Sequence, residues 1–268
     1  MKLPIFQVDA FAGNAFSGNP AAVCPLDTWL PDDVMQAIAE ENNLSETAFF
    51  VQEGPEDYKL RWFSPQSEVQ LCGHGTLASA FIIFDVLKKG STRVRFHTCI
   101  GTLEVEKDDD YLKMDFPAIP AKPCTDVPKE LALGLRPFPS IVLDSGATAA
   151  DRNYFVVYEA EDEVRSAEPD LASLAKLHPA GVCITAPGTQ CDFVSRYFAP
   201  SYGIPEDPVT GSTHCTLGPY WADRLQKRIL RARQVSARGG ELIVEPHGLR
   251  VTLKGKAVLY LEGRIFLS

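Results

Sequence analysis

Short apolar runs, separated by turn residues, follow one another along most of the chain. In one of them Val94, Phe96 and Thr98 alternate with polar residues, which is the period of a strand with one buried face. Glycines such as Gly101 and Gly248 separate neighbouring runs and are typical of turns. The pattern predicts a protein built mainly of strands, at residues 5–8, 47–51, 60–63, 94–98, 103–105, 112–114, 141–143, 154–158, 182–185, 193–198, 242–244, 249–253, 258–261 and 265–267.

Four segments carry helical signals instead. Pro31-Asp32-Asp33 fits the first turn of a helix, because proline needs no amide there and acidic side chains suit the positive end of the helix dipole. Residues 75–87 are apolar almost all round and predict a buried helix. Residues 170–177 predict a short amphipathic helix, and a fourth helix follows Ser212. Pro219 falls within this fourth helix, where we expect a kink or an early end.

One sequence pattern occurs twice. Residues 61–65 (Arg-Trp-Phe-Ser-Pro) and 196–200 (Arg-Tyr-Phe-Ala-Pro) each lead through a loop to a glycine, Gly73 or Gly211, that opens a helix. The repeat predicts two related halves that meet in a proline-rich stretch. We place them at residues 1–118, with a central helix at 75–87, and at 119–268, with a helix from about residue 212; the last strand could pair with either half.

Composition narrows the classes of function. The 268 residues include 26 basic and 35 acidic side chains, a net charge of −9, which argues against binding to nucleic acid or to anionic lipid. No apolar run approaches the ~18 residues that span a bilayer, and the first residues lack a signal-peptide pattern. Seven cysteines without CxxC spacing favour free thiols, and we expect six of them to be small buried apolar groups. These features predict a cytoplasmic globular protein that binds neither nucleic acid nor membranes.

The two glycine-opened helices offer a place for an anion. The first turn of a helix leaves backbone amides without partners, and the helix dipole adds positive potential. The amides of Gly73 and Gly75 in one half, and of Gly211 and Thr213 in the other, could therefore hold a carboxylate in a crevice between the halves, with the Ser212 hydroxyl assisting. The histidines lack metal-ligand spacing, so we expect no metal, and neither a P-loop nor a dinucleotide-binding motif is present.

Three residues could move or position a proton, and one thiol could line the pocket. Glu46 heads an apolar strand, where the disfavoured carboxylate charge suits proton transfer near neutral pH. His74 could relay a proton or donate to a substrate anion, and Asp207 could orient an amine or a histidine. Cys72 lies at a helix N-terminus, but its counterpart in the repeat is Thr210, a weak base, so a racemase with two thiols is disfavoured. Each of these residues also has an ordinary structural reading, as a strand-edge glutamate, a core histidine or a turn cap.

Six stretches together resemble the phenazine-biosynthesis PhzF-like family, within the diaminopimelate-epimerase-like superfamily. They occur in family order and resemble most closely the widespread phenazine-biosynthesis-like domain proteins. The stretches are residues 8–11, 18–23, 45–49, 61–65, 71–76 and 207–212.

The resemblance implies an α+β fold of two pseudo-symmetric halves, each a curled, mostly antiparallel, barrel-like sheet around a central helix. It also implies an active site in the crevice between the halves, no cofactor, and a homodimer. In the family's isomerase a glutamate moves a proton between two carbons of a dihydro-hydroxyanthranilate; Glu46 matches that glutamate, while His74, Asp207 and Ser212 match its supporting residues. The phenazine isomerase itself lacks a cysteine at the position of Cys72, which argues against the phenazine substrate.

The leading hypothesis is a cofactor-independent isomerase that moves a carbon-bound proton on a small cyclic or amino-acid-like carboxylate. Glu46 is the general acid and base in this hypothesis, His74 and Asp207 are the other catalytic residues, and Ser212 with the helix amides and Cys72 binds substrate. One alternative is a racemase or epimerase of the same fold, which needs a second base. The other is a binding or adaptor protein with a vestigial pocket.

Overall fold

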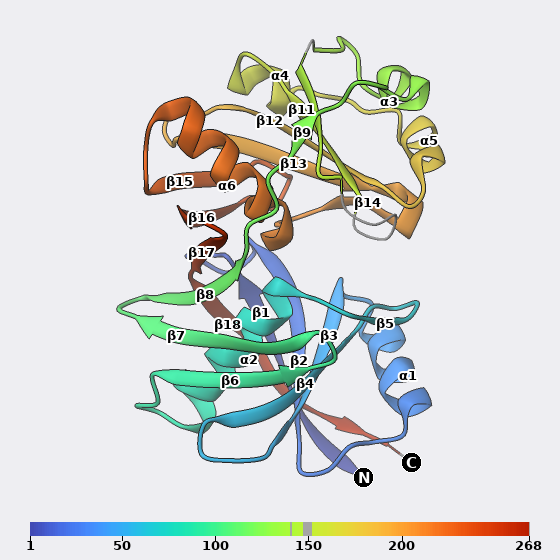
Figure 1. Cartoon of the computed structure of the whole chain (residues 1–268). Helices are drawn as coiled ribbons and strands as arrows, with labels where there is room; N and C mark the ends of the chain where they lie inside the picture. The colour runs from blue at the N-terminus through green and yellow to red at the C-terminus, as the bar shows by residue number, and fades with distance from the viewer. Residues whose placement is uncertain (140, 147–151, 268) are drawn as a thin grey trace. The chain divides into compact units, whose positions relative to one another are not determined.

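The computed structural model describes residues 1–139, 141–146 and 152–267, which form two units. The first unit consists of Met1–Asp115 and Leu253–Ser268, and the second of Phe116–Thr252 (Figure 1). The boundary therefore lies after residue 115 rather than 118. The C-terminal segment belongs with the first unit, which is one of the two possibilities that the sequence left open.

The first unit is a sheet that curls around one helix. Neighbouring strands pair in the order β18–β1–β2–β3–β4–β6–β7–β8, and all pairs are antiparallel except β2–β3 and β4–β6. The central helix α2 is buried from His74 to Ala80 and continues into a π-helical segment, η1 (Figure 1). The elements are β1 (Lys2–Ala10), β2 (Asn19–Leu26), α1 (Asp32–Asn42), β3 (Glu46–Gln52), β4 (Asp57–Phe63), β5 (Glu68–Val69), α2 (Gly73–Phe81), η1 (Ile82–Leu87), β6 (Arg93–Thr98), β7 (Gly101–Asp108), β8 (Tyr111–Pro117) and β18 (Ala257–Phe266).

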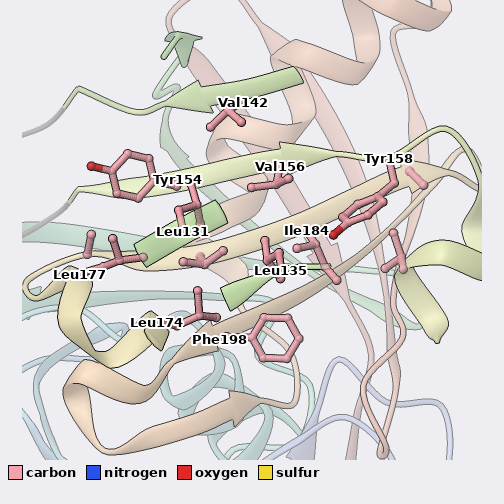
Figure 2. Close-up of a cluster of buried hydrophobic side chains, with 14 of the residues drawn as sticks. Leu131, Leu135, Val142, Tyr154, Val156, Tyr158, Leu174, Leu177, Ile184 and Phe198 are labelled. Carbon is pink, nitrogen blue, oxygen red and sulfur yellow. The ribbon is translucent and has the colours of Figure 1, made fainter. Parts of the chain in front are cut away.

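The second unit packs short helices on one face of its sheet. Figure 2 shows Leu131 of α3, Leu135 directly after it and Leu174 of α5 against Val156 and Ile184, whose strands lie side by side. The elements are β9 (Lys122–Pro123), α3 (Lys129–Gly134), β10 (Ile141–Asp144), β11 (Asn153–Val157), α4 (Glu161–Arg165), α5 (Leu171–Leu174), η3 (Ala175–Leu177), β12 (Gly181–Pro187), β13 (Phe193–Ala199), η4 (Pro200–Tyr202), β14 (Ile204–Asp207), α6 (Gly211–Leu225), β15 (Leu230–Gln234), β16 (Gly240–His247) and β17 (Arg250–Gly255).

The two units repeat one topology. β1 to β7 and β10 to β16 pair in the same sequence of antiparallel and parallel ladders, including the parallel pairs β2–β3 and β11–β12. The repeated arginines also have the same surroundings. Arg61 pairs with Glu68 on the following strand, as Arg196 does with Glu206, and each guanidinium lies 5.0–5.1 Å from the ring of the phenylalanine two residues on. The predicted pseudo-symmetric α+β fold is confirmed.

Pro219 does not end α6, so of the two expected outcomes, a kink or an early end, the early end was wrong. Proline cannot donate the backbone hydrogen bond that would reach the carbonyl of Cys215, four residues earlier. That carbonyl instead accepts a hydrogen bond of 3.0 Å from the amide of Ile119, and the helix continues to Leu225. A neighbouring segment thus satisfies the carbonyl that the proline leaves free.

Other expectations hold in part. Each predicted strand matches an observed one to within a residue at its ends, the last two being parts of β18, whereas β2, β5, β9, β14 and β15 were not predicted. All seven cysteines lie among the described residues and none forms a disulfide; Cys24, Cys183 and Cys215 are buried as expected, Cys124 and Cys191 are half-buried, and Cys99 is exposed, contrary to expectation. None of the described helices combines the length and apolarity needed to cross a membrane.

Candidate active site

Strand β3 and helix α2 bring Glu46 and His74 together in the first unit. Glu46 is the first residue of β3 and lies opposite Ala21 of the parallel strand β2, which fixes its place at the end of the sheet. Cys72 caps α2, and its sulfur accepts a hydrogen bond of 3.2 Å from the amide of Gly75. The cap places His74 in the first turn of a buried helix, with its ring directed at the end of β3.

The three side chains form a compact cluster. Nε2 of His74 lies 2.9 Å from Oε2 of Glu46, and Nδ1 of the same ring lies 3.6 Å from Sγ of Cys72. Both partners of the ion pair are largely removed from water, with exposed side-chain fractions of 9% for His74 and 12% for Glu46. Oε2 of Glu46 is itself buried, and no hydrogen-bond donor is aligned with it in the part of the chain that the structure describes. The carboxylate therefore keeps an acceptor oxygen inside the site.

The charges in this cluster favour a protonated His74 beside an ionised carboxylate. Burial alone would lower the pKa of His74, but the neighbouring Cys72 sulfur and Glu46 carboxylate raise it well above its ordinary value. Burial raises the pKa of the Cys72 thiol to about 11, so this thiol is uncharged near neutral pH. The negative charge that stabilises the imidazolium at neutral pH is therefore that of Glu46.

The same three side chains could in principle offer ligands to a metal ion. One ligand atom from each of Glu46, Cys72 and His74 lies within 4.8 Å of the others. Zinc sites usually take four ligands, or three and a water, with the ligand atoms directed at one point. Here the imidazole contacts the carboxylate directly at 2.9 Å, and the described residues add no fourth ligand. The arrangement fits proton transfer better than metal binding.

Asp207 belongs to a buried hydrogen-bond network of the second unit. It ends β14, and its carboxylate accepts a short hydrogen bond from the hydroxyl of Thr210, the residue before α6. Gln234 of β15 joins both residues: its Oε1 accepts from the amide of Thr210 at 2.9 Å, and its Nε2 donates to the carbonyl of Asp207 at 2.7 Å. This glutamine is 1% exposed, so the loop from Asp207 to Thr210 is held from inside the unit.

The first turn of α6 divides its residues between solvent and core. Gly211 and Thr213 are buried, whereas Ser212 is exposed. The hydroxyl of Thr213 donates to the carbonyl of Thr210 at 2.9 Å. Nδ1 of His214 lies 2.8 Å from the same carbonyl, and burial lowers the pKa of this histidine to about 4, so it is neutral and donates through Nδ1. Ser212 is therefore the side chain of this turn that is open to a ligand.

The residues predicted from the sequence lie in two groups, and the structure adds one residue that was not predicted. Glu46, Cys72 and His74, with Gly73 and Gly75, gather in the first unit, while Asp207, Gly211, Ser212 and Thr213 lie in the second. Gln234 was not predicted. It follows Thr210 by 24 residues in a segment rich in arginine, and no local pattern marks it as a partner of Asp207.

Comparison with known proteins identifies the family. The family model described as "Phenazine biosynthesis-like protein" matches residues 8–263. An uncharacterized isomerase of Pseudomonas aeruginosa is 51% identical over 269 residues and the match covers 100% of both chains. Phenazine biosynthesis-like domain-containing protein 2 of mouse is 42% identical, with 99% of each chain covered.

Solved structures show the same fold. A phenazine biosynthesis protein of the PhzF family from Enterococcus faecalis has a TM-score of 0.92 and 43% identity, with 100% of each chain covered. A probable proline racemase from Agrobacterium radiobacter has a TM-score of 0.67 at 11% identity, a likeness of fold alone, over 99% of this chain and 93% of that one. With a family match that spans nearly the whole sequence, the chain belongs to the phenazine biosynthesis-like PhzC-PhzF family.

Proposed function

We propose that this protein is an isomerase that moves a carbon-bound proton on a small cyclic or amino-acid-like carboxylate, with Glu46 as general acid and base. The observation that carries the proposal is the buried Glu46–His74 pair: Oε2 of Glu46 lies 2.9 Å from Nε2 of His74, and the two side chains are only 12% and 9% exposed. A carboxylate held in a largely water-free site beside a proton donor is suited to general acid and base catalysis.

The proposed reaction needs only one proton carrier. The ionised Glu46 takes a proton from one substrate carbon, the substrate's double bond shifts, and the neutral acid returns the proton to another carbon. His74 stays within 2.9 Å and can stabilise the carboxylate before and after the transfer. The positive end of the α2 dipole can stabilise negative charge that develops on the substrate, although the amide of Gly75 already donates to Cys72. Names of relatives support the assignment, because the P. aeruginosa relative is called an isomerase.

Proton transfer can be tested by exchange with solvent. The protein is incubated in D2O with cyclic and amino-acid carboxylates, including the dihydro-hydroxyanthranilate, and NMR and mass spectrometry read carbon-bound deuterium and the position of the double bond. Glu46→Gln keeps the shape of the side chain but removes the base, so we expect a loss of about 10²-fold or more. Glu53→Gln, which alters an exposed glutamate paired with Lys59, is the matched control. Full turnover by Glu46→Gln would refute the proposal.

Epimerisation at one carbon is the second candidate, and Cys72 favours it. Its sulfur lies in the same 4.8 Å cluster as Glu46, so the site holds a second group that can carry a proton. In that reaction one group removes the proton and the other returns it to the opposite face. Solvent deuterium at an inverted carbon, lost in Cys72→Ser, would support epimerisation. A shift of the double bond that survives Cys72→Ser would support the isomerase.

A further inference from the structure

The first unit contains a cavity of about 300 Å³ beside strand β4. It lies where β4 changes partners, because Lys59 is the last residue registered against β6 and Trp62 is the first registered against β5. Trp62, Val69 of β5 and Thr98 of β6 line the cavity, and Trp29 adds a second aromatic ring. The volume is at the lower end of the range of small-molecule sites, about 300–1,000 Å³.

The second unit has a buried glutamine at the corresponding place. The repeated arginines and the strand registers pair the residues of the two units as follows: Trp62 with Tyr197, Val69 with Asp207, and Thr98 with Gln234. Gln234 accepts from the amide of Thr210 and donates to the carbonyl of Asp207. Thr98 is shorter, and its hydroxyl donates at 2.7 Å to the carbonyl of Gly101 in its own hairpin. The first unit thus has a cavity where the second has a side-chain amide.

A buried hydrogen-bond donor of the cavity wall lacks an acceptor. Trp62 is 1% exposed, and its indole Nε1 has no hydrogen-bond partner among the described residues. Its counterpart in the second unit, Tyr197, donates its hydroxyl to Oδ1 of Asn153 at 2.8 Å. The N–H of a buried tryptophan usually has a partner. An acceptor atom of a ligand in the cavity would supply it.

The charges around the cavity favour a neutral ligand. Arg61 and Lys59, the arginine and the lysine that line it, both have carboxylate partners at 2.7–2.8 Å. His97, which also lines it, lies 3.1 Å from the carboxylate of Asp57. A cation that already faces a carboxylate offers little further attraction to an anion. The two tryptophans of the wall favour a flat aromatic body instead.

We propose that this cavity binds a small neutral aromatic carboxamide. The planar amide takes the part that the side chain of Gln234 has in the second unit. Its oxygen accepts from the indole N–H of Trp62, and its amino group donates to the carbonyl of Val69, the counterpart of Asp207. The bound amide holds the segment between β5 and α2, as Gln234 holds the segment before α6.

Benzamide is the probe, and the indole N–H signals of the three tryptophans are the readout. Titration of the isotope-labelled full chain, followed by NMR, should give saturable shifts of the Trp62 and Trp29 signals and leave the Trp221 signal in place. Single Trp→Phe variants assign the three signals. Benzoate has the same ring but carries a charge and no N–H donor, so its Kd should be about tenfold higher or more.

A side-chain amide introduced at Thr98 tests the location. Thr98→Gln gives the first unit the residue that the second unit has, so it should weaken benzamide binding about tenfold or more. Thr92→Gln, at an exposed position outside the cavity, is the matched control and should bind as the wild type does. Glu46→Gln should also bind normally, because Glu46 does not line the cavity. The spectra themselves show whether each variant is folded.

Four results would overturn the proposal. The Trp62 signal could stay in place at saturating benzamide, or benzoate could bind as tightly as benzamide. Thr98→Gln could bind as the wild type does, which would place the probe elsewhere. Loss of binding in Glu46→Gln would place it in the candidate active site. None of these readouts requires turnover, so they do not depend on the proposed reaction.

Discussion

At the scale of single residues, the Glu46–His74 pair is where sequence reasoning reached furthest. Alternation placed Glu46 at the head of an apolar strand, and glycines placed His74 at a helix entry; the structure brings these side chains to 2.9 Å. Both inferences used local patterns. The contact itself joins residues 28 positions apart and depends on how β3 and α2 pack, which local patterns do not encode.

The His74 ion pair makes stability depend on pH. The pKa of His74 is raised in the folded protein above its unfolded value of about 6.5, so its contribution is complete below about pH 6.5 and is lost as pH rises through the folded-state value. We expect the urea midpoint to fall with rising pH in this window. The slope should flatten in His74→Gln, and in Glu46→Gln because the stabilising anion is removed. An identical slope in the wild type and both variants would contradict the assigned ion pair.

At the scale of elements, one buried glutamine fixes where α6 begins. Gln234 of β15 accepts from the amide of Thr210 and donates to the carbonyl of Asp207, so it holds the turn between β14 and α6. The hydroxyl of Thr210 receives a weaker donation from the same amide group at 3.2 Å. A helix start that carries a candidate site residue is thus positioned by a strand more than 20 residues away along the chain.

Replacing Gln234 should therefore lower the free energy of unfolding by more than an average substitution does. Gln234→Leu removes the hydrogen bonds of its side chain to the Thr210 amide and the Asp207 carbonyl, and we expect it to lower the free energy of unfolding by about 2–4 kcal/mol. Gln66→Leu, at an exposed loop position, is the control and should change it by less than about 0.5 kcal/mol. Urea unfolding followed by circular dichroism measures both. Equal, small effects of the two variants would show that Gln234 does not hold the turn.

Two of the strands that the sequence did not predict contain residues that are unusual in a buried strand. β2 contains Pro20 and Pro25, and β15 contains Arg231 and Arg233, all of which argue locally against a buried strand. In the structure β2 lies between β1 and β3, and β15 between β13 and β16, so pairing on both sides outweighs the local signal. α2 shows the converse, because its apolar sequence alone was enough to predict a buried helix.

At the scale of the whole molecule, the repeated sequence pattern was the informative signal. Two five-residue matches were enough to predict two related units, and the ladders of the structure repeat in the same order. The residues at which the two units divide could not be predicted, because the last strand of the chain belongs to the first unit. Antiparallel β1 and β18 join the two ends of the chain, and a pairing over that separation leaves no local pattern.

The C-terminal strand β18 should be essential for the stability of the first unit but not for the stability of the core of the second. Deleting residues 257–268 strips β1 of nine registered partners and uncovers buried Leu3 and Phe6, whereas the apolar cluster of the second unit contains none of the deleted residues. The three tryptophans allow each unit to be followed separately, since Trp29 and Trp62 lie in the first and Trp221 in the second. In the Trp221→Phe variant, the fluorescence of Trp29 and Trp62 follows the first unit alone. In the double variant Trp29→Phe, Trp62→Phe, the fluorescence of Trp221 follows the second unit alone.

The truncation should lower the urea midpoint that Trp29 and Trp62 report. The shift should correspond to a loss of about 3 kcal/mol or more in the free energy of unfolding of the first unit, because several apolar side chains become exposed to water. The transition seen by Trp221 should move far less. Coincident shifts at both reporters would mean that the two units unfold as one cooperative body. In that case each unit would owe its stability to the other, and the C-terminal strand would support the whole chain rather than the unit that it completes.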